Sequence, residues 1–348
     1  ALWLLASCAP GPGTPPPTGV DQTPPAAAPL VIEDGVLYVA LIWHQHQPVY
    51  GIDPETGAYV RPWVRVHAAK DYLDMGTTVA QDPRIHVTFN LTPSLILQLD
   101  DLAAGARDLY WVLTEVDAAD LTQSQKRFLL ERFFDTNPRI IERFPRYREL
   151  ARMRGGSDPT QIEAALAGWT TQDFRDLQAL FNLAWTDPDW LAQEPLASLV
   201  ERGGDYTEGD KDVVLAEHDR LVREVIPALA RLQQQGQIEI TTTPFAHPIL
   251  PLLVDSNLAR QAMPDADLPP RFTHGEDAVA QVELGVEMYQ DHFAMAPRGM
   301  WPAEGSVAPG IVSMIANAGI RWIASDEGVL ALSLPGMDGF TRDSADTV

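Results

Sequence analysis

The sequence has 348 residues, of which 45% are apolar and 21% are charged, which is typical of a globular protein with a large buried core. Lysine and arginine total 25 against 48 aspartate and glutamate residues, so the formal net charge is -23. A field of that sign repels phosphate backbones and anionic lipid headgroups, and we therefore expect no nucleic-acid partner. The same field does not disfavour the binding of a neutral polymer.

The first residues resemble the end of a secretory signal. Leu2 to Cys8 (LWLLASC) is an apolar run that closes on a bacterial lipobox, while the charged start of such a segment is missing and residue 1 is Ala. We interpret residues 1–8 as a partial lipoprotein signal peptide. Acylation of Cys8 would anchor the protein, outside the cytoplasm, to the bacterial cell envelope or surface. The alternative is a cysteine without a role in a disordered leader. Cys8 is the only cysteine, which excludes an intrachain disulfide and a multi-cysteine metal site.

Residues 9–34 are mostly proline, glycine, alanine and threonine and contain little that a core would bury. Such a composition predicts a semi-rigid, disordered tether. We expect the folded region to cover residues 35–348.

Predicted strands and helices alternate along this region. Val36 to Trp43 (VLYVALIW) is a continuous apolar run, as expected of a strand buried on both faces. Further strands are predicted at Arg84–Leu91, Gln237–Thr243, Arg298–Trp301 and Ile320–Ala324, with helices at 68–80, 210–235, 277–293 and 308–318 between or before them. This alternation favours a parallel sheet of the α/β class.

The stretch at about 102–195 interrupts the alternation. Its pattern is helical, and it contains four of the nine tryptophans. We interpret it as a helical insertion after the second strand that forms a lid or wall over a site.

Polar and aromatic side chains follow the predicted strands at the ends where α/β barrels carry functional residues. Indoles stack on sugar rings, while carboxylates and imidazoles bind hydroxyls and carry out acid–base or nucleophilic steps, so this mixture is typical of a carbohydrate site. The candidates are His44, His46 and Gln47 after the first strand, Glu239 and His247 at the third, Trp301 and Glu304 after the fourth, and Asp326 and Glu327 after the fifth.

Each candidate also has a purely structural interpretation. His44 and His46 point to the same side of a strand, so they are either packed histidines or two ligands of a metal. Glu239 is alternatively a buried hydrogen-bond anchor, Trp301 a core residue, and Asp326-Glu327-Gly328 a loop turn. Their joint placement at strand ends favours a functional role for the set.

Three motifs, in this order along the chain, resemble the first three signature regions of glycoside hydrolase family 57. They are His44-Gln45-His46-Gln47-Pro48, then GQIEI (236–240) with TTPFAHP (242–248), and MWPAE (300–304). The likeness extends from about Leu37 to Leu334 and is greatest to bacterial amylopullulanase-like and α-amylase-like members of the family.

The resemblance implies an incomplete (β/α)7 barrel with its first five strands present. It also implies a retaining glycoside hydrolase or transglycosylase that acts on α-glucans such as starch, glycogen or pullulan, in the class of α-amylase, amylopullulanase and 4-α-glucanotransferase. Glu304 matches the nucleophile of the family. The residues that would bind substrate are His44, His46, Gln47, Glu239, His247, Trp301 and Asp326.

In the implied mechanism, Glu304 attacks the anomeric carbon while a carboxyl group about 5–5.5 Å away protonates the leaving oxygen. The family's acid/base is an aspartate in an Asp-Gly-Glu segment, with which Asp338-Gly339-Phe340 shares only two residues. No acid/base is therefore assigned. We expect that the chain is cut at both ends and that these 348 residues alone are inactive.

Two other functions remain as alternatives. A metal-dependent carbohydrate deacetylase or α-mannosidase-like barrel would use His44 and His46 as ligands, but the sequence shows no third ligand at a convincing spacing. A non-catalytic, glucan-binding surface lipoprotein would keep the cleft without the chemistry. We expect no cofactor and no required metal, because the sequence has no Asp-rich loop with calcium-site spacing.

Overall fold

The computed structural model describes residue 36 and residues 39–333. Cys8, the predicted tether and Asp338-Gly339-Phe340 lie outside the described residues. The chain divides into one unit at Ala1–Val39 and a second at Ala40–Val348, and the fold below is that of the second unit.

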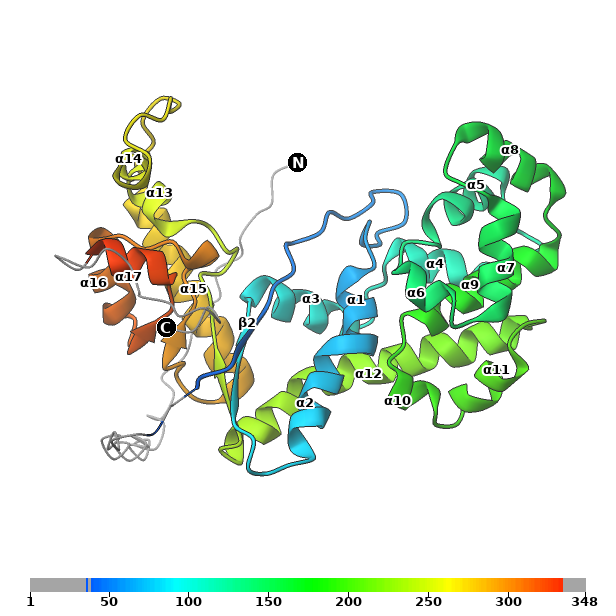
Figure 1. Ribbon diagram of the computed structural model, residues 1–348, viewed down its shortest axis with the longest axis horizontal. Coiled ribbons are helices and arrows are strands. Elements are labelled where there is room, and N and C mark those ends of the chain that lie inside the picture. The colour runs from blue at the N-terminus through cyan, green and yellow to red at the C-terminus, as the bar shows by residue number, and fades with distance from the viewer. Residues whose placement is uncertain (1–35, 37–38, 334–348) are drawn as a thin grey trace, which may run out of the picture. The chain divides into compact units, whose positions relative to one another are not determined.

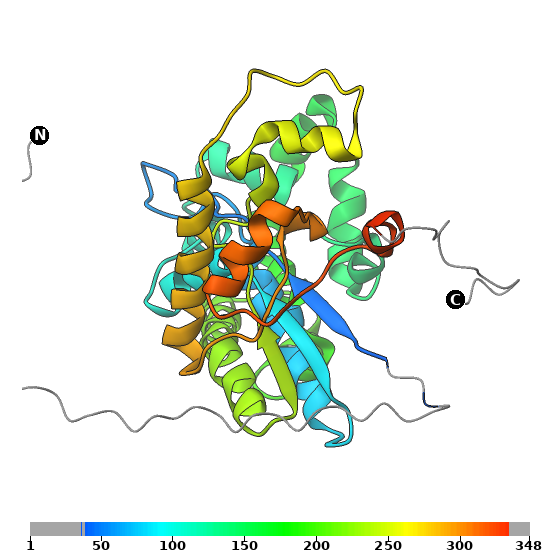
Figure 2. The same ribbon diagram turned by 90° about the vertical axis from the view of Figure 1, so that its left-hand side faces the viewer.

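Five strands form the parallel arrangement that the sequence predicts. β1 (Ile42–Gln45), β2 (Val87–Leu91) and β3 (Ile238–Thr241) make one parallel sheet in this order, and β4 (Gly299–Met300) pairs in parallel with β5 (Trp322–Ile323). The two sheets meet where Thr242 bridges Met300 in parallel and Trp301 N donates to Thr242 O at 2.9 Å. Figure 2 shows β1, β2 and β3 side by side, in blue, cyan and yellow-green.

One face of the sheet forms a core with long helices. α1 (Trp63–His67), the π-helix η1 (Ala68–Tyr72) and α2 (Leu73–Ala80) connect β1 to β2, α3 (Pro93–Ala103) follows β2, and α12 (Glu208–Gln234) leads into β3. Alternate strand residues, including Phe89, Leu91 and Ile240, pack in a cluster with residues of α3 and α12. A capping box at Thr207 begins α12, and the positive φ of Gly236 follows its end.

The predicted insertion, at about 102–195, is made of helices joined by short connections. It contains α4 (Leu109–Glu115), α5 (Gln123–Arg132), α6 (Pro138–Ile141), α7 (Pro145–Arg154), α8 (Pro159–Gly168), α9 (Thr171–Ala184) and α10 (Pro188–Leu191), and α11 (Leu196–Arg202) follows it. These helices enclose their own apolar cluster, which Val214 joins from α12 (Figure 1). The lid or wall role of this region stays a prediction.

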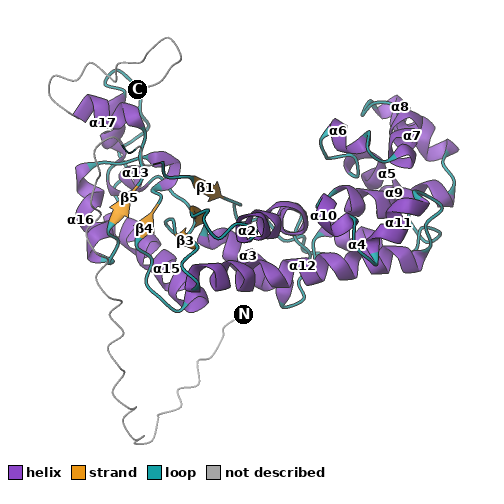
Figure 3. Ribbon diagram, turned by 60° about the horizontal axis from the view of Figure 1, so that its bottom comes forward, coloured by secondary structure: helices purple, strands orange, loops and turns teal. Residues whose placement is uncertain are grey.

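The remaining elements lie between β3 and β5 in the chain or follow β5. They are α13 (Leu250–Val254), η2 (Ser256–Leu258), α14 (Ala259–Ala262), α15 (Gly275–Phe293), η3 (Ala303–Gly305), α16 (Pro309–Asn317) and α17 (Glu327–Ser333). Figure 3 shows the strands in orange, with α16 beside β5. Among the described residues, no helix combines the length and the apolar content that a membrane span needs.

The prediction for the first strand was partly wrong. It placed a strand buried on both faces at Val36–Trp43, whereas β1 begins at Ile42, and Leu41 and Trp43 are 50% and 42% exposed. The reason is that β1 pairs only with β2 within the described residues, so its other edge and much of its surface remain open. An apolar run reports the tendency to form a strand and not how many neighbours the strand has.

Candidate active site at the carboxyl ends of the strands

The candidate residues lie on the face of the sheet opposite the core. Successive side chains of a strand alternate between faces, so when Phe89 and Ile240 enter the core, Asn90 and Glu239 point the other way. His44 is paired with Asn90 across β1 and β2, which places it on the same face.

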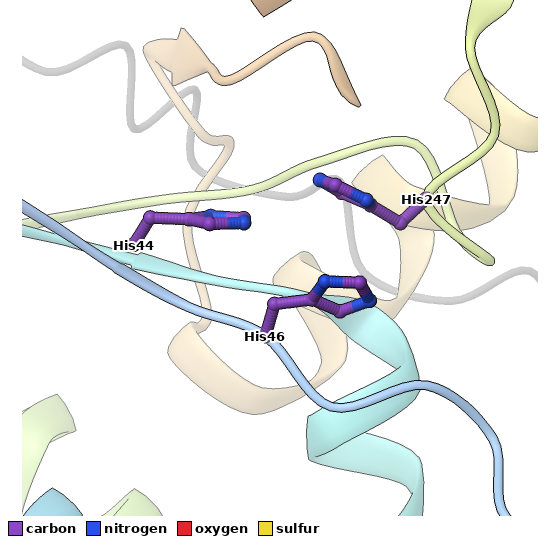
Figure 4. Close-up of side chains that lie close together, drawn as sticks. All are labelled: His44, His46 and His247. Atoms are coloured by element: carbon purple, nitrogen blue, oxygen red, sulfur yellow. The ribbon is translucent and has the colours of Figure 1, made fainter. Parts of the chain in front are cut away.

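Three histidines meet at the strand ends. His44 lies on β1, His46 follows it by two residues, and His247 comes from the loop after β3. The ring centroids lie 5.7 Å apart for His44 and His46, 5.1 Å for His44 and His247, and 4.1 Å for His46 and His247. Figure 4 shows the rings of His44 and His247 pointing toward one another, with His46 beside His247.

The loop that carries His247 is held by α15. Phe245 N donates to Gln281 O at 2.8 Å, and Ala246 N donates to Gln281 Oε1 at 2.7 Å. A Cβ on Gly285 would lie 2.4 Å from Thr243 O, so only glycine at this position lets the loop approach the helix. His247 itself has a φ of 56°, a left-handed conformation that is uncommon for a non-glycine residue and concentrates at functional sites.

Asn90 is a site residue that the sequence analysis did not select. Its Oδ1 lies 2.6 Å from His44 Nδ1, and its Nδ2 donates to Thr241 Oγ1 and Thr242 O, both at 2.9 Å. Because Oδ1 can only accept, His44 carries its proton on Nδ1 and leaves Nε2 as an acceptor. Its position on the polar face of a strand was the only signal in the sequence. Asn90 is fully buried, so it positions His44 and does not reach a ligand itself.

Trp301 lies against the histidines. Its ring stacks on His44 with centroids 5.4 Å apart and planes 15° apart. It is half-buried, and its backbone N–H is held by Thr242. A flat indole fixed beside imidazoles gives a stacking surface next to polar groups, which is what a sugar ring requires.

His46 and His247 favour the neutral form. Burial lowers the pKa of His46, and the adjacent His44 lowers it further, while Glu304 opposes this shift. Burial, with His46 and His44, lowers the pKa of His247 to about 4. Both imidazoles therefore keep a nitrogen lone pair at neutral pH. The His247 side chain is only 3% exposed, and its Nε2 has no hydrogen-bond partner among the described residues.

Glu304 extends from η3, directly after β4. Its φ is 57°, its side chain is 69% exposed, and its Oε1 lies 3.8 Å from His247 Nδ1. At neutral pH His247 is uncharged, so this is a polar contact rather than an ion pair. The carboxylate is thus open to a ligand and adjacent to the three histidines.

Glu239 contacts the last strand across the intervening one. Trp322 Nε1 donates to Glu239 Oε1 at 3.2 Å. Gly299 of β4 pairs with Trp322, and a Cβ there would lie 2.3 Å from two indole carbons. The glycine therefore leaves the space in which the indole reaches Glu239.

Gln47 and Asp326 lie in different settings. Gln47 is 8% exposed; its Nε2 donates to Tyr72 Oη at 2.9 Å and its Oε1 accepts from Tyr50 Oη at 2.6 Å, so its amide already has protein partners.

Asp326 is exposed and accepts a hydrogen bond from Gly328 N at 2.7 Å. Its backbone N would lie 3.8 Å from a Cβ on Gly305, which places Asp326 beside the turn that carries Glu304.

Two groups of side chains among the described residues bring metal-ligating atoms within 4.8 Å of one another: His44, His46 and His247, and Asp74, Asp187 and Asp189. Burial raises the pKa of Asp74, and the other two carboxylates raise it further. In the histidine group, His247 is a candidate third ligand beside His44 and His46, which the spacing of residues in the sequence did not indicate.

Residues 40–344 match the model of a family described as glycosyl hydrolase family 57. Alpha-amylase 1 of Dictyoglomus thermophilum is 30% identical over 104 residues, which are 30% of this chain and 12% of that protein. The 1,4-alpha-glucan branching enzyme of Thermococcus kodakarensis is 31% identical over 86 residues, which are 25% of this chain and 10% of that protein.

Solved structures show a weaker likeness. The alpha-amylase AmyC from Thermotoga maritima has a TM-score of 0.40 and 17% identity, over 83% of this chain and 39% of that chain. The GH57-type branching enzyme from Pyrococcus horikoshii has a TM-score of 0.39 and 17% identity, over 82% of this chain and 40% of that chain. The chain thus spans about two fifths of the length of these structures and about a tenth of the curated relatives.

Proposed function

The chain belongs to glycosyl hydrolase family 57, and we propose that it acts on α-glucans by hydrolysis or transglycosylation, with Glu304 as the nucleophile. One observation carries the assignment of the nucleophile: Glu304 presents an exposed carboxylate from a left-handed turn, 3.8 Å from His247. The names of the two curated relatives, an alpha-amylase and a 1,4-alpha-glucan branching enzyme, support the substrate class.

In this proposal the histidines and Trp301 hold the sugar whose bond is cut. The indole stacks on the ring, while neutral imidazoles donate to and accept from hydroxyls. Glu304 attacks the anomeric carbon and forms a glycosyl-enzyme, which water or a second glucan then releases with retention of configuration. We assign no acid/base among residues 39–333, and Asp326, beside the Glu304 turn, remains a substrate-binding candidate.

We also propose that the five strands belong to a (β/α)7 barrel whose inner face carries the site. The polar face that holds His44, Asn90 and Glu239 would then line the barrel interior, with the catalytic residues at its carboxyl-terminal mouth. The parallel order of β1, β2 and β3 and the bridge from Thr242 to β4 support this arrangement.

The test is Glu304→Gln in the full-length protein. The amide is nearly isosteric with the carboxylate but a poor nucleophile, so release of reducing sugar from starch should fall by on the order of 10³-fold or more while maltooligosaccharide binding survives. Glu276→Gln, an exposed glutamate on α15 paired with His274, is the matched control and should keep full activity. An undiminished rate in Glu304→Gln would exclude this residue as the nucleophile. A wild-type protein that binds maltooligosaccharide but releases no reducing sugar would favour a non-catalytic glucan-binding protein.

A further inference from the structure

We propose that His44, His46 and His247 form a binding site for a divalent transition-metal ion of the Zn²⁺ class, and that this ion and a glucan exclude one another. The metal site follows from the residues themselves. The mutual exclusion rests on the proposed function, because it requires the sugar to use the same histidines.

The three residues supply the right ligand atoms. Imidazole nitrogen is a preferred ligand of Zn²⁺, Co²⁺, Ni²⁺ and Cu²⁺, whereas Mg²⁺ and Ca²⁺ take oxygen ligands. Zn–N bonds of about 2.0–2.1 Å place two nitrogens of a tetrahedral site about 3.3 Å apart. Here the ligand atoms already lie within 4.8 Å of one another. His46 is half-buried and lies outside β1, so its ring has room to rotate over the remaining distance.

The surroundings resemble those of known histidine ligands. A metal-bound histidine usually donates its other ring N–H to an oxygen, which fixes the tautomer and directs the free nitrogen to the ion. Asn90 Oδ1 does this for His44, at 2.6 Å from Nδ1. Asn90 is itself held by Thr241 and Thr242, so the position of His44 is supported by two strands.

His247 provides the independent observation that points to a ligand. Its side chain is 97% buried, that is, 3% exposed, and its Nε2 has no hydrogen-bond partner among the described residues. A buried polar atom without a partner destabilises the fold. The loop holds this ring in place through Gln281 and Gly285 at a backbone conformation that is itself unfavourable, so the fold maintains the ring where an ion would satisfy it.

The site lies next to the nucleophile. Glu304 Oε1 lies 3.8 Å from His247 Nδ1, the ring nitrogen that an ion on Nε2 leaves free, so a water completes the four-coordinate ion. An ion there takes the imidazole nitrogens that the proposed mechanism gives to the hydroxyls of the sugar. Bound metal should therefore inhibit, and the enzyme should not require it.

The test begins with metal binding, measured without substrate. Full-length protein is treated with a chelator, dialysed, and titrated with Co²⁺ while visible absorption reports tetrahedral coordination, and with Zn²⁺ by calorimetry. We expect one Co²⁺ or Zn²⁺ ion to bind per chain and no binding of Mg²⁺. His247→Ala and His46→Ala should each weaken Zn²⁺ binding at least about 100-fold, and Asn90→Ala about 10–100-fold through release of His44. His274→Ala, an exposed histidine paired with Glu276, should bind as the wild type does.

The outcomes separate the two proposals. Circular dichroism of each variant establishes that it is folded. If folded His247→Ala and His46→Ala bind Zn²⁺ as tightly as the wild type, or if the wild type binds none, the metal site is wrong and the proposed function stands. In Glu304→Gln, Zn²⁺ should weaken maltooligosaccharide binding about in proportion to metal occupancy. If Zn²⁺ and maltooligosaccharide bind at the same time, the proposed mutual exclusion is wrong, while the proposed metal site is unaffected.

Discussion

Trp322 on β5 donates a hydrogen bond from Nε1 to Oε1 of Glu239 on β3, at 3.2 Å, across β4. Such a contact between strands that are not neighbours requires the strand between them to have no side chain in the way. Gly299 meets this requirement, since an added Cβ would lie 2.3 Å from two carbons of the indole and 2.9 Å from Thr241 Cγ2. The geometry of Glu239 in the candidate site therefore depends on a glycine in another strand.

Gly299→Ala should destabilise the protein and reduce activity. The indole must move to admit a methyl group, and such overpacking costs about 1–3 kcal/mol in the free energy of unfolding. Glu239 loses its donor at the same time, so kcat/KM on starch should fall. Gly275→Ala is the matched control, because a Cβ there meets nothing within 4 Å. Equal unfolding midpoints in denaturant for the two variants would contradict the role of Gly299.

Asn90→Ala should release His44 as well as destabilise the fold. The substitution leaves the partners of a fully buried amide unpaired, which should cost about 2–3 kcal/mol in the free energy of unfolding. Loss of stability alone would fit any buried residue, so the tautomer of His44 is the decisive measurement. Imidazole ¹⁵N shifts should show a proton fixed on Nδ1 in the wild type and a mixture of tautomers in the variant. Exposed Asn257→Ala should leave the tautomer unchanged.

His218 should make stability depend on pH. It is fully buried on α12, and its Nδ1 accepts from Arg65 Nη1 at 2.7 Å, so its proton lies on Nε2, which is 2.9 Å from Thr186 Oγ1. A second proton would face the guanidinium of Arg65, which is paired with Asp108. Burial, and then Arg65, hold the pKa of His218 well below 6.5 in the folded protein.

The sign of the effect follows from linkage. Above pH 6.5, the pKa of a histidine in the unfolded chain, His218 is neutral in both the folded and the unfolded state. Its contribution to the free energy of unfolding is then fully present. Below this pH the unfolded chain takes up a proton that the folded protein refuses, so the free energy of unfolding falls by about 1.4 kcal/mol per pH unit from this residue. His218→Gln keeps an acceptor for Arg65 and should remove this part of the slope between about pH 6 and pH 5. Urea unfolding across this range checks it, and identical slopes would contradict the assignment.

Cys8 should carry a lipid. We propose, from the lipobox-like LASC at residues 5–8, that the mature protein is anchored to the envelope of a bacterial cell. Radiolabelled fatty acid should enter the full-length native protein and not its Cys8→Ala variant. Equal labelling of the two, or labelling of neither, would remove the anchor and leave the localisation without support.

The positions of the main helices, and of the strands after the first, were predictable because their signals are local. The helical pattern at 210–235 ends at Gly236, and α12 ends at Gln234 with Gly236 at a φ of 73°. The burial of Gln47 could not be predicted from the sequence. A glutamine next to a strand end has the same polar amide whether it faces a ligand or, as here, Tyr50 and Tyr72. The exposure of Trp43 was missed for a related reason, since apolar character does not reveal how many strands lie alongside.

The sequence by itself determined the family, the order of the strands along the chain and the spacing that puts His44 and His46 on one side of a strand, because these depend on neighbouring residues and on ordered motifs. Only the tertiary structure decided that the ring of His247 contacts those of His44 and His46, that Asn90 orients His44 and that Trp322 reaches Glu239. These contacts connect residues far apart in the chain. They depend on which strands pair and in what register, on a left-handed turn, and on glycines whose missing side chains leave room for particular neighbours, and none of these has a local signature.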